Sequence, residues 1–361
     1  MDSMTEAKAV VTGGVDSHAD SHMVAVVDQA GRVLGSKGFG ADAAGHKQAL
    51  NWLRSYGELV KVGVEGTGSY GISLARHLAD QDVEVVEVIR PNRQARRRRG
   101  KSDPADALAA ALAALSGEAR GRPKSHDGMV ESIRALGLAR RGALKGATGA
   151  ANQLRDLIVT APEPLRARLQ PLSLDKRVAV AARFRWADLS DPLQATKAAM
   201  AAVARRHQAL KAEIAKLDAV LKVLVDEAAP KCLLASKGVG TWVASTLLTT
   251  VGDNPARLRT EAGFAALCGV SPVDASSGKQ RRHRLNRGGD RQANSALWRI
   301  VMVRMSCDDR TKAYVERRTA EGKTTKEIVR CLKRYVAREV YKELVGRVGQ
   351  DLETANGPMA A

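Results

Sequence analysis

Four carboxylates of this chain stand where they could share divalent ions. Asp16 and Glu65 each end a short apolar run, and Asp103 and Asp106 lie three residues apart in the segment KSDPADA, on one face of an expected helix. Carboxylates gathered in one place repel one another unless cations neutralise them. Two Mg²⁺ ions about 4 Å apart would do so and would clamp the attacking and leaving oxygens of a phosphoryl transfer. The pattern therefore predicts Asp16, Glu65, Asp103 and Asp106 as ligands of a site with two Mg²⁺ ions.

A simpler interpretation exists for the second pair of acids. Asp103 precedes Pro104, and Asp106 follows in the expected first turn, so both also fit an ordinary helix start. We interpret the neighbouring His18 and His22 as structural, because four oxygen ligands suit Mg²⁺ rather than zinc. All four acids together, in a strand order that can bring them close, favour the metal site.

The first 125 residues alternate between strand and helix patterns, which indicates an α/β layer fold. Three β-rich runs joined by short turns are followed by a helix, a strand, a helix and a strand, the order of ribonuclease-H-like (RuvC-like) domains. In that order the first and fourth strands are neighbours, which would bring Asp16 and Glu65 together. The expected strands are 10–16, 23–27, 33–36, 59–64 and 83–89, and the expected helices are 44–56 and 69–80.

Residues 126–229 form an Ala-rich helical region in which apolar side chains follow three-four spacing. One seam covers about three heptads with a single polar member, His207. Two interpretations stay open: a helical hairpin that packs on itself, or an intermolecular coiled coil that makes this region an oligomerisation region. The seam positions are Met200, Val203, His207, Leu210, Ile214, Leu217, Leu221 and Leu224.

Residues 230–361 are expected to form a mainly helical C-terminal domain, with a last helix at 326–345 and a polar tail from about 347. Its start carries a tight turn, Lys237-Gly238-Val239-Gly240, between two helical patterns, which resembles a helix-hairpin-helix element. Backbone amides of such a turn, at the N-terminus of the following helix, can hold a nucleic-acid phosphate. We therefore include Lys237, Gly238 and Gly240 among the expected nucleic-acid contacts.

The net positive charge of the chain indicates a polyanionic partner. The 58 Lys and Arg residues exceed the 39 Asp and Glu residues, giving a net charge of +19, while aromatic residues make up only 3% of the chain. Phosphate contacts are therefore expected to outweigh base stacking. Two basic runs carry the expected contacts, Arg96, Arg97, Arg98, Arg99 and Lys101 in the first and Lys279, Arg281, Arg282, Arg284, Arg287 and Arg291 in the second.

Several locations are disfavoured by the same sequence. The N-terminal segment has neither the basic start nor the apolar core of a signal peptide, and no apolar run is long enough to span a membrane. The four cysteines stand far apart, which suggests reduced thiols. We expect a cytoplasmic protein with no membrane partner.

Motifs in both halves resemble one family, the DEDD-type insertion-sequence transposases, which have been called bridge-RNA-guided recombinases. GVDSHADSH, VEGTGSYG and KSDPADA resemble their RuvC-like N-terminal domain. KGVGTWVASTLLTTVGD, FAALCGVSP and SSGKQRRHRLNRGGDRQANSAL resemble their C-terminal transposase domain. Two departures occur: Gly269-Val270-Ser271-Pro272 replaces a Gly-Leu-x-Pro, and the usual Lys is missing before Gly289-Asp290.

The resemblance implies a transposase or recombinase of a bacterial insertion sequence, associated with the nucleoid. It implies Mg²⁺ held by Asp16, Glu65, Asp103 and Asp106, with Ser277 as the nucleophile that forms a covalent phosphoserine with DNA. The implied partners are donor and target double-stranded DNA, a structured guide (bridge) RNA, and further copies of the chain in dimers that pair into tetramers.

Two other functions stay open on the residues alone. A junction-resolving or ribonuclease-H-like nuclease would use the same acids but water as its nucleophile, leaving Ser277 without a role. A non-catalytic nucleic-acid-binding protein descended from such an enzyme would bind without metal or cleavage. A covalent protein–DNA adduct would separate the recombinase from both.

Overall fold

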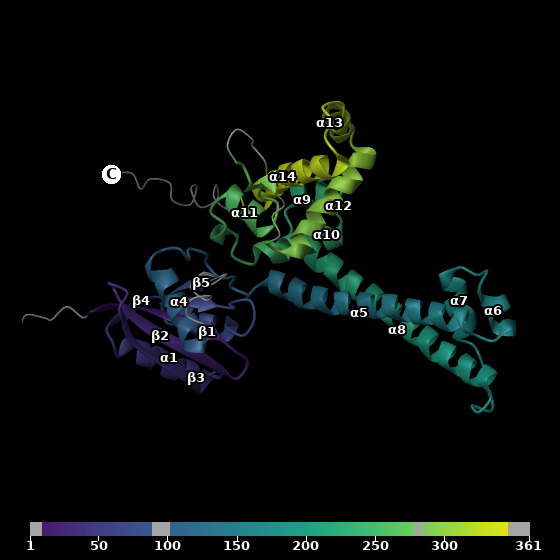
Figure 1. Cartoon of the computed structure of the whole chain (residues 1–361), viewed down its shortest axis with the longest axis horizontal. Helices are drawn as coiled ribbons and strands as arrows, with labels where there is room; N and C mark the ends of the chain where they lie inside the picture. The colour runs from purple at the N-terminus through teal and green to yellow at the C-terminus, as the bar shows by residue number, and fades with distance from the viewer. Residues whose placement is uncertain (1–8, 89–101, 278–282, 285, 287, 346–361) are drawn as a thin grey trace, which may run out of the picture. The chain divides into compact units, whose positions relative to one another are not determined.

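The computed structural model describes residues 9–88, 102–277, 283–284, 286 and 288–345. Its contacts divide the chain into two compact units, Met1–His126 with Asn254–Arg259, and Asp127–Asp253 with Thr260–Ala361 (Figure 1). We call them the α/β unit and the helical unit. Within the described ranges, no helix combines the length and apolar character needed to cross a membrane. The two regions expected at 126–229 and 230–361 lie mostly within the helical unit, and their separate functions remain a proposal.

The α/β unit is built on one five-stranded mixed sheet with the order β3-β2-β1-β4-β5. The first three strands form an antiparallel meander, and β4 and β5 run parallel to β1. The five strands expected from the sequence are confirmed. The elements are β1 (Val10–Ser17), β2 (Ser21–Asp28), β3 (Val33–Gly40), α1 (Ala43–Arg54), β4 (Glu58–Glu65), α2 (Ile72–Ala79), β5 (Glu84–Val88) and α4 (Asp103–Leu115).

Helix α4 packs directly on the backbone of the sheet. A Cβ atom on Gly14 of β1 would stand 2.1 Å from the backbone nitrogen of Ala111 and 2.3 Å from the carbonyl oxygen of Ala107. On Gly63 of β4 it would stand 2.4 Å from the carbonyl oxygen of Ala110. The lack of side chains at these strand positions, and the small side chains of the helix, therefore let α4 lie close against β1 and β4.

The helical unit contains two long helices, α5 (Met129–Val159) and α8 (Pro192–Ala228), that pack against each other. The heptad seam of α8 is covered by α5 of the same chain. Met200 and Val203 share a core cluster with Leu154, and Ile214 packs with Ala147. From Met200 to Ile214 the seam therefore packs on α5 of the same chain, and its role in joining subunits stays a prediction. The short helices α6 (Glu163–Leu169) and α7 (Leu174–Ala181) lie between the two long helices in the chain.

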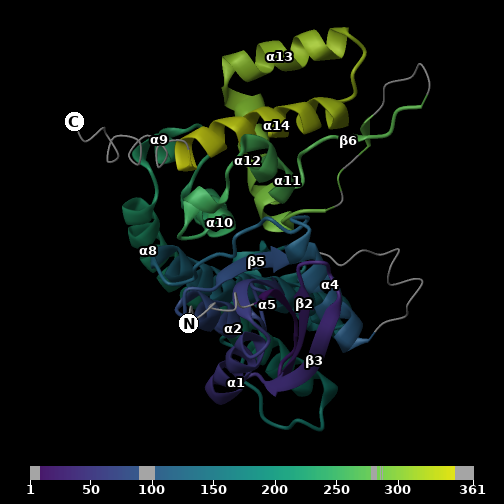
Figure 2. The same ribbon diagram turned by 90° about the vertical axis from the view of Figure 1, so that its left-hand side faces the viewer.

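The remainder of the helical unit surrounds helix α14, which confirms the expected last helix. A capping box starts α14, with the Thr324 side chain on the Glu327 backbone and the Glu327 side chain on the Thr324 backbone. Helices α11, α12 and α13 contact α14, and α13 and α14 lie side by side (Figure 2). The elements are α9 (Lys231–Ala235), α10 (Thr241–Val251), α11 (Glu261–Leu267), β6 (Val273–Asp274), β7 (His283–Arg284), α12 (Arg291–Cys307), α13 (Asp309–Ala320) and α14 (Thr325–Leu344), while η1 (Pro255–Arg257) belongs to the α/β unit.

Candidate functional site

Two neighbouring parallel strands carry the first two predicted ligands. The register pairs Val15 of β1 with Val64 of β4, so Asp16 and Glu65 follow at adjacent positions of the two strands. The Ser17 hydroxyl donates a hydrogen bond to the carbonyl oxygen of Glu65 at 2.7 Å, which ties the two strand ends together. Asp16 is buried and Glu65 is half-buried. The strand order expected from the sequence therefore does place this pair at one end of the sheet.

The start of α4 brings the second pair of acids to Asp16. Single ligand atoms of Asp16, His18 and Asp103 all lie within 4.8 Å of one another. His18 Nε2 stands 3.2 Å from Asp16 Oδ2 and 3.6 Å from Asp103 Oδ1. Asp106 is only 3% exposed, and its charge acts on Asp16. We call Asp16, His18, Asp103 and Asp106 the acid cluster. Only the first three belong to the close group of ligand atoms, and Asp106 and Glu65 lie outside that group.

His18 has a different place from the one expected. The sequence interpretation made it structural, whereas it lies between two of the predicted metal ligands. The signal that could have found it is its spacing, because residues two apart in an extended segment project to the same side. His18 follows Asp16 by two residues at the end of β1.

The surroundings of Asp16 disfavour its ionised form. Burial raises the pKa of Asp16, His18 lowers it, and the charges of Asp106 and Asp103 raise it further. A divalent ion would reverse this balance, because it stabilises every carboxylate that it contacts. Carboxylate oxygens are the ligands that Mg²⁺ prefers. The donor set therefore fits a hard divalent cation, with Asp16 and Asp103 in the close group of ligand atoms and Asp106 acting on Asp16 through its charge.

The C-terminal serines differ in their surroundings. The Ser276 hydroxyl and backbone nitrogen both donate to Asp274 Oδ1, at 2.5 Å and 2.9 Å. Ser277 is exposed, and within the described part of the chain its hydroxyl makes no hydrogen bond. These hydrogen bonds from Ser276 lower the pKa of Asp274, and His283, which pairs with Asp274 across β6 and β7, lowers it further. Ser276 is thus engaged by its neighbour, whereas the side chain of Ser277 is exposed.

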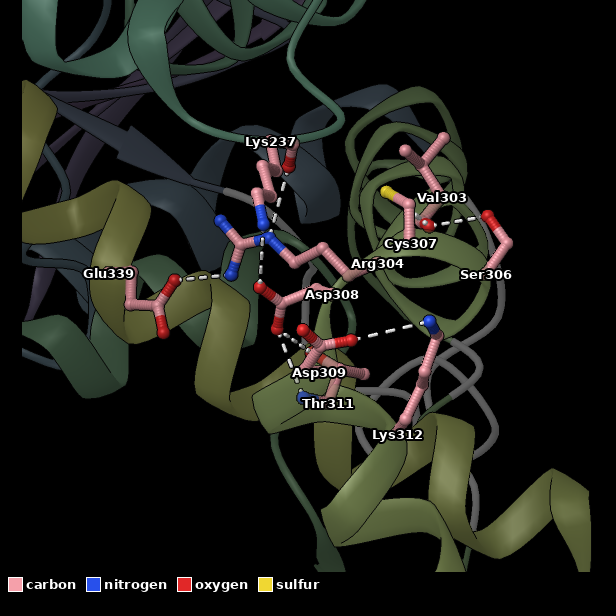
Figure 3. Close-up of polar contacts among 10 residues, drawn as sticks. All are labelled: Lys237, Val303, Arg304, Ser306, Cys307, Asp308, Asp309, Thr311, Lys312 and Glu339. Atoms are coloured by element: carbon pink, nitrogen blue, oxygen red, sulfur yellow. Dashed lines mark hydrogen bonds and ion pairs between the residues drawn. The ribbon is translucent and has the colours of Figure 1, made fainter.

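The predicted phosphate-binding turn is anchored to α12, α13 and α14 (Figure 3). Arg304 donates to the carbonyl oxygen of Lys237 at 3.0 Å and pairs with Glu339 at 2.5 Å, while Lys237 Nζ lies 3.4 Å from Asp308 Oδ1. Gly238 has φ +89° and packs on the backbone of α12, where an added Cβ would meet the Cα of Ile300 at 3.0 Å.

Gly240 differs from Gly238 in its surroundings. It is the N-cap residue of α10, and a Cβ there would meet nothing within 4 Å. Gly238 is therefore required by packing, and Gly240 is the open glycine of the turn.

The remaining predicted contacts divide into two groups. Arg284 lies in β7 and Arg291 begins α12, and both are exposed. The other members of the basic runs, and the polar tail from about 347, lie outside the described residues; the basic residues concerned are Arg96, Arg97, Arg98, Arg99, Lys101, Lys279, Arg281, Arg282 and Arg287.

The fold and the acid cluster together define a class: a mixed α/β sheet compatible with a ribonuclease-H-like domain, carried by a chain whose remainder is helical. Comparison with known proteins narrows this class. Residues 13–161 match a model of IS110-type DEDD proteins described as transposase. Residues 231–316 match a second model, transposase IS116/IS110/IS902 family. The chain therefore belongs to the IS110-type DEDD transposase family, as its motifs predicted.

One curated relative extends this result. The insertion element IS110 uncharacterized 43.6 kDa protein of Streptomyces coelicolor (strain ATCC BAA-471 / A3(2) / M145) is 32% identical over 155 residues. The aligned stretch is 42% of this chain and 36% of the relative, so the chain spans little more than a third of the relative's length.

Proposed function

We propose that this protein is the transposase of an insertion sequence, which cleaves and exchanges DNA strands in a Mg²⁺-dependent reaction. The single observation that carries the proposal is the gathering of Asp16, His18 and Asp103 at the end of β1, with Asp106 buried beside them. Family membership supports the reaction class. The excess of basic residues supports a nucleic-acid substrate.

In this proposal Asp16, Glu65, Asp103 and Asp106 hold the metal ions. Bound Mg²⁺ supplies positive charge to the oxygens of the reacting phosphate. His18 is well placed to orient the two carboxylates that it contacts and to hold a proton at Nε2, 3.2 Å from Asp16. The tight packing of α4 on Gly14 and Gly63 supports the rigidity that a shared metal site needs.

Ser277 is the proposed nucleophile. Its Oγ would form a bond to the phosphorus of the scissile phosphodiester, the bond from phosphorus to the leaving DNA oxygen would break, and the leaving oxygen would take up a proton. The hydroxyl proton must pass to a base, and His283, on the strand that pairs with β6, is a candidate acceptor. The exposure of Ser277, beside a Ser276 hydroxyl engaged by Asp274, supports the choice of Ser277.

The acid cluster belongs to the α/β unit and Ser277 to the helical unit. We therefore propose that the complete active site forms when the two units meet, from one chain or from two chains of a dimer or tetramer. A structured guide RNA would select donor and target DNA by base pairing, and the basic residues of the chain would contact the phosphates.

The decisive experiment traps the covalent intermediate. Wild-type protein is incubated with Mg²⁺, guide RNA and labelled DNA, and the adduct is mapped by mass spectrometry. We expect phosphoserine at Ser277, none in Ser277→Ala, and at least partial activity in the matched variant Ser276→Ala. Cleavage without any adduct would indicate a nuclease that uses water, and binding without cleavage would indicate a non-catalytic protein.

A mixing experiment tests whether two chains share the site. Ser277→Ala keeps its acids and Asp16→Ala keeps its serine. If the site combines two chains, mixing the two inactive variants restores part of the recombination. If each chain builds its own site, the mixture stays inactive.

A further inference from the structure

Helix α14 forms one wall of a cavity of about 870 Å³ in the helical unit. The other walls come from the turn 269–272, from β7 and from the end of α13. Seven of the lining side chains are Lys or Arg, and one, Glu327, is acidic. The volume is within the range of ligand-binding pockets. We call this the cationic cavity.

Ion pairs with carboxylates of the protein neutralise only three of the seven lining cations. Arg334 and Arg338 share Glu261, and Arg318 pairs with Glu321. Within the described ranges no ion pair is found for the other four cations, Arg284, Lys323, Arg330 and Lys333. Glu327 acts on Lys323 and Arg330 electrostatically without forming an ion pair, so one carboxylate faces these four cations. Like charges held together in excess are unfavourable unless a further anion joins them.

Lys333 is the most costly of these unpaired cations because its side chain is buried, with only 8% exposed. Its Nζ donates to Asn294 Oδ1 at 2.9 Å. The amide nitrogen of Asn294 donates to the carbonyl oxygens of Cys268 and Gly269, which turns the amide oxygen of Asn294 toward the lysine. Burial and the charge of Arg330 lower the pKa of Lys333. A buried ammonium with a neutral partner is costly, and a bound anion would offset that cost.

A second cavity of the same unit provides a contrast. It has about 770 Å³ and is also lined by basic residues, including Lys237 and Arg304. Lys237 forms an ion pair with Asp308, and Arg304 forms one with Glu339, so carboxylates of the protein already neutralise these two cations. Among the described residues, the cationic cavity holds four cations without an ion pair, whereas the second cavity holds one, Arg310. This difference in unpaired charge, not volume or basic lining, distinguishes the cationic cavity.

From these observations we infer that the cationic cavity binds the phosphodiester backbone of a nucleic acid, with Lys333, Lys323 and Arg330 as the phosphate contacts. Cations from several elements suit a chain of phosphates better than one isolated anion. Tyr335, which lines the cavity and is 47% exposed, offers a ring on which a base could stack. The inference rests on the proposed function for its nucleic-acid partner and assigns a binding site apart from the acid cluster and Ser277.

The test measures binding of the full-length chain to labelled oligonucleotides without Mg²⁺, over a series of salt concentrations. The variant Lys323→Ala/Arg330→Ala removes two exposed cations of the cavity. The matched control Lys211→Ala/Lys216→Ala removes two exposed cations of α8. We expect the cavity variant to lose about tenfold or more in affinity and to lower the log–log salt slope by about two for duplex DNA. The control should stay within about twofold of wild type, because its lysines make no specific phosphate contact. Equal losses in both variants, or no loss in the cavity variant, would overturn the assignment.

The variant Lys333→Met tests whether Lys333 serves oligonucleotide binding or the stability of the fold. Removal of a buried charge should leave the melting temperature unchanged or raise it, while oligonucleotide affinity falls about tenfold. A lower melting temperature with unchanged affinity would make Lys333 a structural residue and overturn its role. Lys333→Gln keeps a donor near Asn294 without the charge, and its affinity should match that of Lys333→Met.

Parallel titrations with RNA and DNA of one sequence identify the source of the phosphate. A larger loss for RNA assigns the cavity to RNA, and equal losses assign it to the backbone that both share. The binding assay needs no strand cleavage, so its failure leaves the Ser277 adduct test untouched. Absence of that adduct likewise leaves the binding result standing.

Discussion

The acid cluster of the α/β unit and the cationic cavity of the helical unit both crowd like charges, but with different kinds of side chain. The acid cluster uses the short carboxylates of Asp16, Asp103 and Asp106, whose positions follow from the backbone of β1 and α4. The cationic cavity uses long Lys and Arg side chains, mostly from α13 and α14 and the turn that joins them. Short side chains on rigid elements suit a small ion with fixed ligand geometry. Long, flexible cations suit a polymer whose phosphates vary in position. The carboxylates of the acid cluster thus indicate a metal cation as their ligand, and the Lys and Arg side chains of the cationic cavity indicate phosphate groups.

Loss of one carboxylate should have the largest effect and should separate the two regions. Asp16→Asn is expected to reduce DNA cleavage by at least about 1,000-fold, the scale on which loss of transition-state charge stabilisation acts. Oligonucleotide affinity should stay unchanged, because the cationic cavity is intact. Cleavage assays and binding titrations on the same preparation measure both. Asp20→Asn, which changes an exposed acid near β1, is the control and should retain activity. Cleavage by Asp16→Asn at the wild-type rate would remove the acid cluster from the mechanism.

Disturbing the packing of α4 on the sheet should have the next largest effect. Gly14→Ala places a methyl group 2.1 Å from the backbone of α4, so either the helix or the strand must move. We expect a loss of about 3 kcal/mol or more in unfolding free energy, at the upper end of overpacking costs. Cleavage should fall too, because the shift carries Asp103 and Asp106 away from Asp16. Urea unfolding and cleavage assays check this.

Gly38→Ala is the matched change in the same sheet. Its added Cβ would meet Met23 Cε at 3.8 Å, an ordinary contact. We expect little change in stability or cleavage. If both glycine variants behave alike, the close approach of α4 does not determine the geometry of the acid cluster.

Mg²⁺ binding should distinguish the acid cluster from the cationic cavity without any cleavage assay. Mg²⁺ at about 100 times its dissociation constant should stabilise the α/β unit by about 2.7 kcal/mol, since only the folded cluster binds it. Hydrogen exchange of peptides from β1 and α4, with and without Mg²⁺, measures the effect. The cationic cavity should show no such protection. A full Mg²⁺ effect in Asp16→Asn would place the ion elsewhere.

The smallest expected effect, taken over the single pH unit from 6.5 to 5.5, is the loss of stability caused by a buried histidine of the α/β unit. His22 is 1% exposed and stacks on His46 at 5.4 Å between ring centroids. Burial, with the nearby His46 and His18, lowers the pKa of His22 to about 4. The unfolded chain takes up a proton near its ordinary pKa of about 6.5, whereas the folded chain does so only near 4. Stability of the α/β unit should therefore fall as pH drops from about 6.5 to about 4, by up to about 1.4 kcal/mol per pH unit.

His22→Leu tests this source of acid sensitivity. The variant removes the titrating group, so the loss of stability between pH 6.5 and 5.5 should shrink. Hydrogen exchange of β2 peptides, corrected for the intrinsic pH dependence of exchange, gives the measurement. An unchanged pH profile would show that another group causes the sensitivity.

The sequence by itself determined the local elements and the residues at their ends. Alternation and turn residues located the five strands, and the acids at strand ends were visible because the chain direction fixes which residue comes last in each run. The helical starting point of Asp103 and Asp106 followed from Pro104 and the alanines after it. Family membership was also readable from the motifs, because it depends on residue identity and order alone.

The tertiary structure decided which distant segments cover each residue. His18 lies against Asp103 because α4 packs on β1, and the seam of α8 is covered by α5 of the same chain. Lys333 has the local pattern of an ordinary helical lysine, and its burial comes from elements far away in sequence. Periodicity tells which face of an element a residue occupies. It does not tell which other element packs on that face, because that choice depends on the combined packing of the whole unit.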